Sequence, residues 1–428
     1  MNFLSVPVPE DVRTAEIQGD FREAERRIEK WLNGELHPCM RLRLEYEKER
    51  IFRIRREYGI SLQRGIERLK REIGYVKEET IEEWIRSGAL DCRNIDGKMR
   101  CFNRFVDNLA FAEPAIAMRR KKKNAKAKEL LLQTLIRMST GESRKYRITA
   151  GIRLKIRKKY EGEKFRVWLP LPQERFQSEK VRIIASKPQV SYISTAEQRT
   201  AYFETREREI NMEFEYEISE VSGGLEGEVK EEHKGEKLPH IAFTPYIKSL
   251  AERVAGDGDT MEKARRIYNW VTSHMRYFYV RNYGTYENIG EYAAVNLRGD
   301  CGFHAILFIA LCRAVGIPAK WQSGWFITPY YAGPHDWAQV FVNGEWYPVD
   351  ASFGNLRRHT KVENEFYFGN LDAFRMIAND DILSPFNPRK MHWRSDPVDN
   401  QVGEVETDKN LYYGDFSWKI YFKDIKKI

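Results

Sequence analysis

The sequence predicts a multidomain α+β protein with an N-terminal helical domain, an antiparallel β-sandwich and a mixed helix-and-strand core. Two observations lead to this prediction. The chain has 428 residues, 42% of them apolar, which is enough for two or three domains with proper cores. Apolar residues recur at helical spacing early in the chain, at strand spacing in the middle, and in both patterns afterwards. The predicted domains are 1–140, 145–222 and 240–355, followed by an extension, 356–428, that packs on the core.

The first domain is predicted to be helical because apolar residues stand three and four apart among Arg and Glu, as in "RLRLEYEKERIFRIRREYG". Within it, Asp96-Gly97 predicts the turn of a short hairpin. A helix followed by a hairpin is compatible with a winged DNA-binding element, but a structural or partner-binding helical domain is the favoured interpretation. The basic run at 118–129, "MRRKKKNAKAKE", fits a solvated helix face better than a nucleic-acid site. We therefore expect any partner of this domain to be a protein rather than nucleic acid.

The second domain is predicted to be an immunoglobulin-like β-sandwich. "YRITAGIRLKIRK" and "INMEFEYEIS" alternate polar and apolar residues, and short strand-like segments lie between them. The third domain begins with helices. One of them, "HAILFIALCRAVG", is apolar throughout and ends at Gly316, and strand-like segments follow it. This order of helices and then strands indicates an α+β core.

Composition limits the partners and the location of the protein. The chain has 72 basic and 63 acidic residues, and the resulting charge of +9 permits an anionic partner without requiring one. No apolar run reaches about 18 residues, so no membrane span is predicted. Five cysteines, an odd number, do not indicate a disulfide framework, and no signal peptide is visible. The cytoplasm is the simplest prediction, although a secreted chain trimmed of its signal would look the same.

Cys301 is the candidate nucleophile. In "GDCGFHA" it stands between glycines that allow a sharp turn and the start of an apolar helix. Backbone N–H groups and the dipole at a helix N-terminus favour the thiolate. Cys312 lies inside the same helix and is expected to belong to the core. His304 follows Cys301 by one turn, but no second Cys–His pair with zinc spacing accompanies it, so neither a metal nor a cofactor is expected.

His335 and Asp350 are predicted to complete a catalytic triad with Cys301. "HDWAQVFV" begins at His335 and "EWYPVD" ends at Asp350, and both read as strands. If Asn343-Gly344 forms the turn between them, the histidine and the aspartate lie near the same open end of a hairpin. The carboxylate can then hold one ring nitrogen and leave the other for the sulfur. Asp336 is the poorer partner, because it adjoins His335 and points to the opposite face of the strand.

These segments resemble the signature blocks of the transglutaminase-like, papain-like cysteine enzyme superfamily. The resemblance rests on "RGDCGFHAILFIALCRAVGIPAKWQSGW", "HDWAQVFV" and "GEWYPVDASFG", in that order, and covers about 241–354. It places the family's nucleophilic cysteine on Cys301, its histidine on His335 and its aspartate on Asp350. The preceding sandwich, with "VWLPLP", resembles a β-domain found ahead of such cores in bacterial members. The helical region before residue 140 has no counterpart in this resemblance.

The resemblance also implies how the oxyanion of the reaction is held. One donor is expected to be the backbone N–H of Cys301. The second donor in the superfamily is a side chain upstream of the cysteine, such as an indole or an amide, but no Trp or Gln occurs between residues 271 and 300. Tyr277 or Tyr279 is the replacement that we consider. Residues expected to line the cleft are Trp325, Trp337 and Tyr330, with core packing as an equal alternative for Trp337.

A thiol-dependent hydrolase of peptide or amide bonds, a cysteine protease or amidase, is the predicted function. The thiolate attacks the carbonyl carbon, the imidazole protonates the leaving amine, and water releases the thioester. The same triad would serve protein-glutamine acyl transfer or a peptide N-glycanase, so protein, peptide and glycopeptide substrates all stay open. Hydrolysis is favoured because nothing in the sequence indicates a tunnel that excludes water and admits lysine. A catalytically inactive binding or scaffold protein is the alternative of a different class.

Overall fold

The computed structural model describes residues 3–119, 125–409 and 413–428, so part of the predicted basic run at 118–129 lies outside the described residues. The chain divides into two compact units, and each takes residues from separate stretches of the sequence. The first unit comprises Met1–Lys123, Arg276–Asn288 and Arg298–Asp300; the second comprises Asn124–Met275, Ile289–Leu297 and Cys301–Ile428.

The first unit packs amphipathic helices around a three-stranded antiparallel sheet of order β1-β3-β2. Side chains from several helices meet in one apolar core, to which Phe21, Leu44 and Leu69 contribute. Asp20 caps the second helix by accepting a hydrogen bond from the backbone N–H of Glu23. The elements are α1 (Glu10–Gln18), α2 (Phe21–Leu32), α3 (Pro38–Glu57), β1 (Ile60–Ser61), α4 (Leu62–Ile73), α5 (Glu78–Arg86), β2 (Cys92–Ile95), β3 (Lys98–Cys101), α6 (Phe105–Ala112), α7 (Pro114–Arg119), β11 (Arg276–Tyr277) and β12 (Arg298–Gly299).

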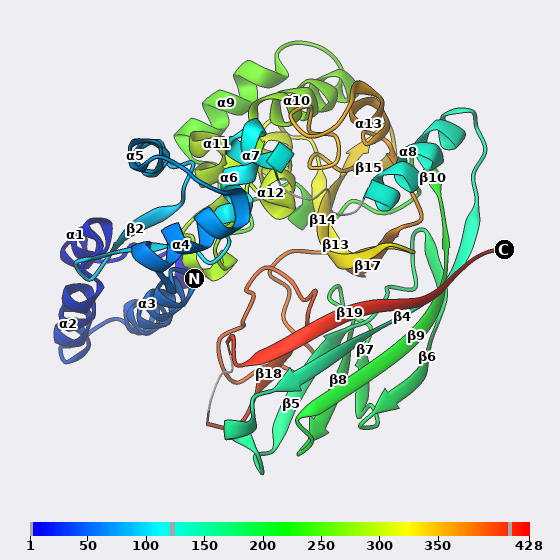
Figure 1. The fold of residues 1–428 in the computed structure, drawn as a ribbon. Helices are drawn as coiled ribbons and strands as arrows, with labels where there is room; N and C mark the ends of the chain where they lie inside the picture. The colour runs from blue at the N-terminus through cyan, green and yellow to red at the C-terminus, as the bar shows by residue number, and fades with distance from the viewer. Residues whose placement is uncertain (1–2, 120–124, 410–412) are drawn as a thin grey trace. The chain divides into compact units, whose positions relative to one another are not determined.

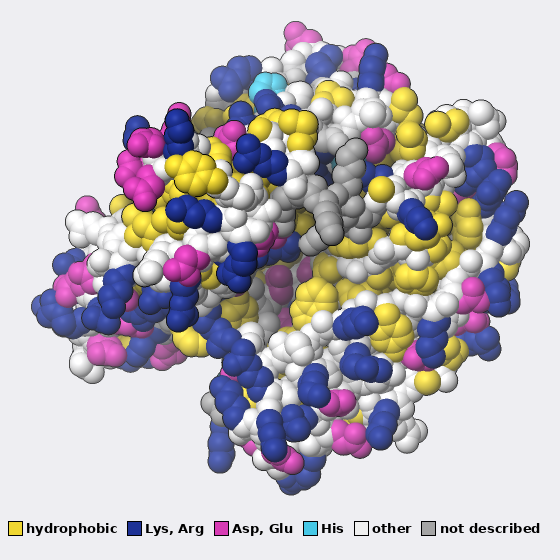
Figure 2. All heavy atoms as spheres, viewed as in Figure 1, with side chains coloured by type: hydrophobic (Ala, Val, Ile, Leu, Met, Phe, Trp, Pro, Cys, Tyr) yellow, Lys and Arg dark blue, Asp and Glu magenta, His cyan; other side chains and the backbone are white. Residues whose placement is uncertain are grey.

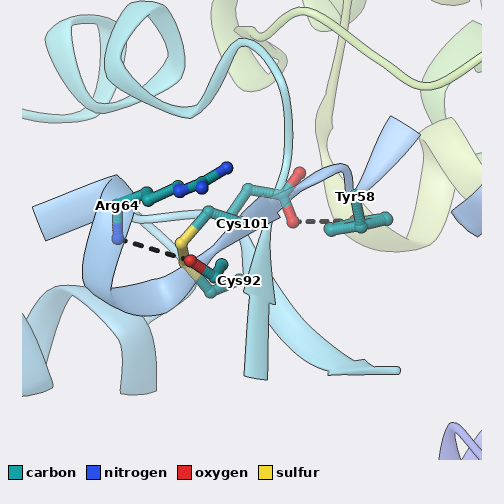
Figure 3. The surroundings of a disulfide bond; sticks show 6 residues. Tyr58, Arg64, Cys92 and Cys101 are labelled. Carbon is teal, nitrogen blue, oxygen red and sulfur yellow. Dashed lines mark hydrogen bonds between the residues drawn. A yellow bond between two sulfur atoms is a disulfide. The ribbon is translucent and has the colours of Figure 1, made fainter. Parts of the chain in front are cut away.

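The predicted hairpin at Asp96-Gly97 is confirmed, and it carries a disulfide bond that the cysteine count did not predict. Cys92 on β2 lies directly opposite Cys101 on β3, and the two sulfurs are bonded (Figure 3). An odd number of cysteines excludes complete pairing, but it says nothing against a single bond between neighbouring strands. The argument from cysteine count to a reducing compartment therefore no longer holds. The cysteines that keep their thiols are Cys39, Cys301 and Cys312.

The second unit contains two four-stranded antiparallel sheets that face each other across one apolar core (Figure 1). The strand orders are β19-β4-β9-β6 and β18-β5-β8-β7. Alternate residues of β4 and β9, such as Ile148, Ile152 and Phe214, are buried, as expected for strands with one covered face. The strands are β4 (Lys145–Ile156), β5 (Phe165–Pro170), β6 (Ser178–Lys187), β7 (Tyr192–Ser194), β8 (Thr200–Thr205), β9 (Glu209–Ser219), β18 (Glu404–Glu406) and β19 (Phe416–Lys427).

The outer strands β18 and β19 come from the C-terminal segment, which differs from the prediction that 356–428 packs on the core as a separate extension. β19 pairs with β4 from Phe416↔Ile156 to Lys427↔Tyr146, and β18 pairs with β5. Without these partners, β4 and β5 would be sheet edges with unpaired backbone N–H and C=O groups. Local periodicity identifies a strand but not its partner, so the sequence alone predicts a sandwich of 145–222 only.

In the rest of the second unit, the apolar helix α12 (Cys301–Ala314) packs against a four-stranded antiparallel sheet of order β15-β14-β13-β17. Every residue of β13 is buried, so both faces of this sheet are covered. The sheet strands are β13 (Ala319–Thr328), β14 (Tyr331–Val342), β15 (Glu345–Val349) and β17 (Arg375–Asn379), and the other elements are α8 (Ala125–Ser139), β10 (Val221–Ser222), α9 (Pro245–Ala255), α10 (Thr260–His274), α11 (Ile289–Asn296), α13 (Lys361–Phe366) and β16 (Asn370–Leu371).

Charged side chains of both signs are mixed on the face drawn in Figure 2, where Lys and Arg lie among Asp and Glu rather than in one patch. This distribution is consistent with a charge of +9 that is the difference between 72 basic and 63 acidic residues. Among the described helices, none is long and apolar enough to cross a membrane.

Candidate active site

Cys301 is the first residue of α12, and its thiol contacts a carboxylate on β14. The helix residues from Gly302 to Arg313 are buried, which fixes the position of the helix against the sheet. Cys301 itself is half-buried, and its Sγ lies 3.1 Å from Oδ2 of Asp336. The structure thus places the sulfur at a helix N-terminus, as predicted, and brings it to Asp336.

The hairpin predicted from Asn343-Gly344 is confirmed. Val342 pairs with Glu345, and the register continues regularly to Ala338↔Val349. Asn343 and Gly344 have φ values of 53° and 90°, which suit a two-residue type I′ turn.

This register brings His335 and Asp350 to the same end of the hairpin. Nε2 of the imidazole lies 2.6 Å from Oδ2 of the carboxylate. Both side chains are buried, with relative exposures of 4% for His335 and 0% for Asp350.

Asp350 is held by donors on both of its oxygens. Oδ1 accepts hydrogen bonds from the backbone N–H and hydroxyl of Ser352 and from the backbone N–H of Phe353, at 3.0–3.2 Å. Oδ2 accepts from Nε and Nη2 of Arg375 at 3.3 and 3.0 Å. Burial alone would raise the pKa of Asp350, but His335, the Arg375 charge and these donors lower it below its usual value, so the carboxylate is ionised.

Arg375 connects Asp350 to a second buried carboxylate. Its Nη1 lies 2.5 Å from Oδ2 of Asp372, which also accepts the hydroxyl of Tyr367 at 3.0 Å. The guanidinium carbon lies 4.3 Å from the centre of the Phe353 ring and 4.9 Å from that of Tyr367. One cation and two carboxylates therefore share a site enclosed by aromatic rings.

The contact with an ionised carboxylate fixes the tautomer of His335. A carboxylate only accepts hydrogen bonds, so Nε2 carries the proton and Nδ1 keeps a lone pair. Burial lowers the pKa of His335 more than Asp350 raises it, which favours a neutral ring at pH 7. A neutral imidazole with an unprotonated Nδ1 can accept a proton from a thiol.

Neighbouring side chains fix the orientation of the His335 ring. Trp337 stacks on it with ring centres 5.7 Å apart, and the indole N–H donates to Oε1 of Gln322 at 3.0 Å. On β13, Gly324 lies directly opposite His335, and a Cβ there would come within 2.0 Å of the carbonyl oxygen of Met376. Glycine at this position therefore allows β17 to approach the strand that faces the histidine.

His335 and Asp336 project to opposite faces of β14. The pairing of β14 with β13 is regular here, with His335 opposite Gly324 and Asp336 opposite Ser323, and adjacent residues of such a strand alternate between faces. The imidazole bound to Asp350 and the carboxylate that receives the thiol of Cys301 therefore lie on different faces.

The residues predicted to line the cleft or to donate to the oxyanion differ in burial and in the unit to which they belong. Trp325 is fully buried and stacks on Phe214 of the sandwich with ring centres 5.4 Å apart, so in this structure it offers no face to a substrate. Trp337 is also fully buried, whereas Tyr330 is 51% exposed. Tyr277 and Tyr279 belong to the first unit, where both rings pack against Phe111, and their role as oxyanion donors stays a prediction.

Arg375 and Gln401 are not among the residues predicted for the site, and Asp336 is predicted only as the poorer partner of His335. Arg375 stands in the otherwise apolar stretch "FRMIA", and a lone charged residue on a buried strand usually has a buried partner. This pattern could therefore have predicted a buried partner for Arg375. For Gln401, whose amide nitrogen donates to Oδ1 of Asp336, no local pattern gave an indication. Among the described residues, no cluster of three or more His, Cys, Asp or Glu is arranged to hold a metal ion.

Residues 248–351 match the sequence model of the Transglutaminase-like superfamily. This segment is a transglutaminase-like domain. The domain includes α12, the β14–β15 hairpin and all three residues of the predicted triad. No curated protein matches the chain.

Two solved structures are similar to parts of this chain. A "putative cysteine protease" from Cytophaga hutchinsonii is 13% identical, with a TM-score of 0.43 and coverage of 67% of this chain and 91% of that chain. The periplasmic domain of TgpA from Pseudomonas aeruginosa is 13% identical, with a TM-score of 0.31 and coverage of 50% and 92%.

Proposed function

We propose that the transglutaminase-like domain is a thiol-dependent hydrolase of peptide or amide bonds. Cys301 is the nucleophile, His335 is the base, and Asp350 orients the base. The observation that supports this most is the buried His335–Asp350 pair at 2.6 Å, within a segment that matches the family and begins its apolar helix at Cys301. An imidazole held through Nε2 by a carboxylate is the arrangement that thiol catalysis requires.

The proposed reaction proceeds through a thioester. Nδ1 of His335 accepts the thiol proton, and the sulfur of Cys301 forms a bond to the carbonyl carbon of the substrate. The imidazolium then gives its proton to the leaving amine as the C–N bond breaks. Water adds to the thioester with His335 again as base, which releases the carboxylic acid and restores the thiol.

Proton transfer to His335 requires the thiol to leave Asp336. The thiol and the imidazole have partners on different faces of β14, so the structure corresponds to a resting arrangement in this proposal.

The contact between the thiol and Asp336 also favours a second candidate, a binding protein that keeps the domain without its reaction. A carboxylate beside a cysteine disfavours the thiolate, which is the reacting form. In this candidate the Cys301→Ala variant keeps the protein's biological effect, and a protein partner co-purifies with both forms.

A substrate screen that compares the wild type with Cys301→Ala tests the first proposal. Peptides, glycopeptides and glutamine peptides with a primary amine are offered in parallel. Amine release without amine incorporation indicates hydrolysis, whereas incorporation indicates acyl transfer. Cys39→Ala is the matched control, because Cys39 is a half-buried thiol of the first unit.

We expect turnover in the wild type and in Cys39→Ala and none in Cys301→Ala. Turnover that survives in Cys301→Ala contradicts the proposed nucleophile. A related measurement is the rate at which iodoacetamide alkylates Cys301. If His335 is its base, His335→Gln slows this alkylation, and an unchanged rate contradicts that role.

A further inference from the structure

Asp336 is a buried carboxylate in contact with the candidate nucleophile, and the triad does not use it. Its Oδ2 lies 3.1 Å from Sγ of Cys301, and its relative exposure is 4%. Burying a carboxylate lowers the stability of the folded state unless the carboxylate is hydrogen-bonded. Its partners therefore decide whether this contact is incidental or built by the fold.

The other oxygen of Asp336 is held by the C-terminal part of the chain. Oδ1 accepts a hydrogen bond from the side-chain amide of Gln401, and the same nitrogen donates to Oδ2 of Asp399 at 2.9 Å. Asp399 in turn accepts the hydroxyl of Ser323, the residue directly opposite Asp336 on β13. The backbone carbonyl of Gln401 accepts the indole N–H of Trp325 at 2.6 Å.

This arrangement is difficult to explain by stability alone. One amide nitrogen joins two buried carboxylates, and burial raises the pKa of Asp399. An apolar group at position 336 would avoid the cost of burying a second carboxylate. The bonds from Gln401 instead fix the orientation of the Asp336 carboxylate, with Oδ2 toward the sulfur.

We propose that Asp336 is a further catalytic-site residue, which binds the Cys301 thiol in its protonated resting form while Gln401 fixes the carboxylate for this contact. The proposal rests on the proposed function, because it concerns the same nucleophile. Asp336 accepts the S–H hydrogen bond, and its negative charge opposes loss of the thiol proton. Catalysis begins when the thiol moves from Asp336 to Nδ1 of His335.

Alkylation of Cys301 by iodoacetamide at pH 7 tests this role, since the reagent reacts with the thiolate and requires no substrate. The Asp336→Asn variant keeps the shape of the side chain and removes its charge, and Asp336→Ala is a second variant that removes the acceptor altogether. The rate at Cys301 is measured by peptide mass spectrometry and divided by the rate at Cys39 in the same sample. Asp381→Asn is the matched control, because it neutralises an equally buried carboxylate whose partner is Lys237.

We expect Asp336→Asn and Asp336→Ala to alkylate about 3- to 10-fold faster than the wild type, the range that corresponds to about a tenfold gain in thiolate. Asp381→Asn is expected to stay at the wild-type rate. Wild-type or slower rates in both Asp336 variants overturn the proposal, and so does an equal acceleration in Asp381→Asn.

His335→Gln in the same assay separates this proposal from the proposed function. If only the base role of His335 is wrong, His335→Gln keeps the wild-type rate while the Asp336 variants still accelerate. If only the Asp336 proposal is wrong, His335→Gln slows alkylation while the Asp336 variants do not accelerate it.

Discussion

Replacing Arg375 by Met is expected to lower the free energy of unfolding of the second unit by about 3–5 kcal/mol. Arg375 is fully buried and makes three hydrogen bonds to carboxylates, two to Asp350 and one to Asp372. At about 1.5–3 kcal/mol each, three charge-assisted bonds would sum to about 4.5–9 kcal/mol. They are not additive, however, and a Met side chain restores apolar contact with the surrounding rings. The expected loss is therefore the free-energy cost of leaving two buried carboxylates without the cation that they share.

Urea unfolding followed by tryptophan fluorescence measures this cost. With a slope of about 2–3 kcal/mol per M, a loss of about 3–5 kcal/mol lowers the transition midpoint by about 1–2.5 M. Arg182→Met is the control, because Arg182 pairs with Glu215 at 2.7 Å but its side chain is 69% exposed, so its loss should cost less than about 1 kcal/mol. If Arg375→Met shifts the midpoint no more than Arg182→Met, the buried network does not stabilise the His335–Asp350 pair.

Four further outcomes are expected. Burial lowers the pKa of His335, so the unfolded state binds more protons than the folded state. The free energy of unfolding therefore falls as the pH drops below the unfolded histidine pKa of about 6.5. His335→Gln should weaken this fall, which thermal melts between about pH 6.5 and 5 measure. Cys92→Ser should cost the first unit about 2.5–3 kcal/mol in urea unfolding, because the bond to Cys101 closes a loop with a sequence separation of 9. Cys312 should resist alkylation until denaturant is added, because burial raises the pKa of its thiol. Gly324→Ala should lower the melting temperature, because its Cβ would meet the carbonyl of Met376 at 2.0 Å.

Each of these expectations has an outcome that contradicts it. The same acid sensitivity in His335→Gln would assign the pH dependence to other groups. A reductant that destabilises Cys92→Ser as much as the wild type would show that the disulfide is not the cause. Alkylation of Cys312 in the native protein would contradict its burial. An unchanged melting temperature in Gly324→Ala would mean that β17 can move away from β13 at little cost.

The hairpin of the candidate site was predictable because its signals are local. Asn343-Gly344 specifies a tight turn, and strand alternation then brings His335 and Asp350 to one end. The sequence also predicted correctly that Asp336 points away from His335, but it gave no sign that this face receives the thiol of Cys301. That contact depends on where α12 packs against the sheet, which no spacing within either segment determines.

The pairing of distant strands and the composition of the two units could not be predicted from local signals either. "FSWKIYFKDIKK" alternates well enough to indicate a strand, yet its pairing with β4 joins segments that lie far apart in the sequence. The two units are also discontinuous: 276–288 and 298–300 belong with the N-terminal helices although both flank α11, which does not. Composition and periodicity change along the chain, so they indicate contiguous domains and cannot show that a short stretch packs elsewhere.

The pairing of β19 with β4 has a consequence for how the protein is made. Ile156 pairs with Phe416, and 416 − 156 = 260 residues must be added by the ribosome between the two. At about 5–20 residues per second, the edge of β4 stays unpaired for about 13–50 s during synthesis. The nascent chain therefore exposes the unpaired edge of β4 while these residues are added, and the sandwich closes only after β19 has left the exit tunnel. Expression conditions that slow elongation lengthen this exposure, and with it the time available for association with other nascent chains.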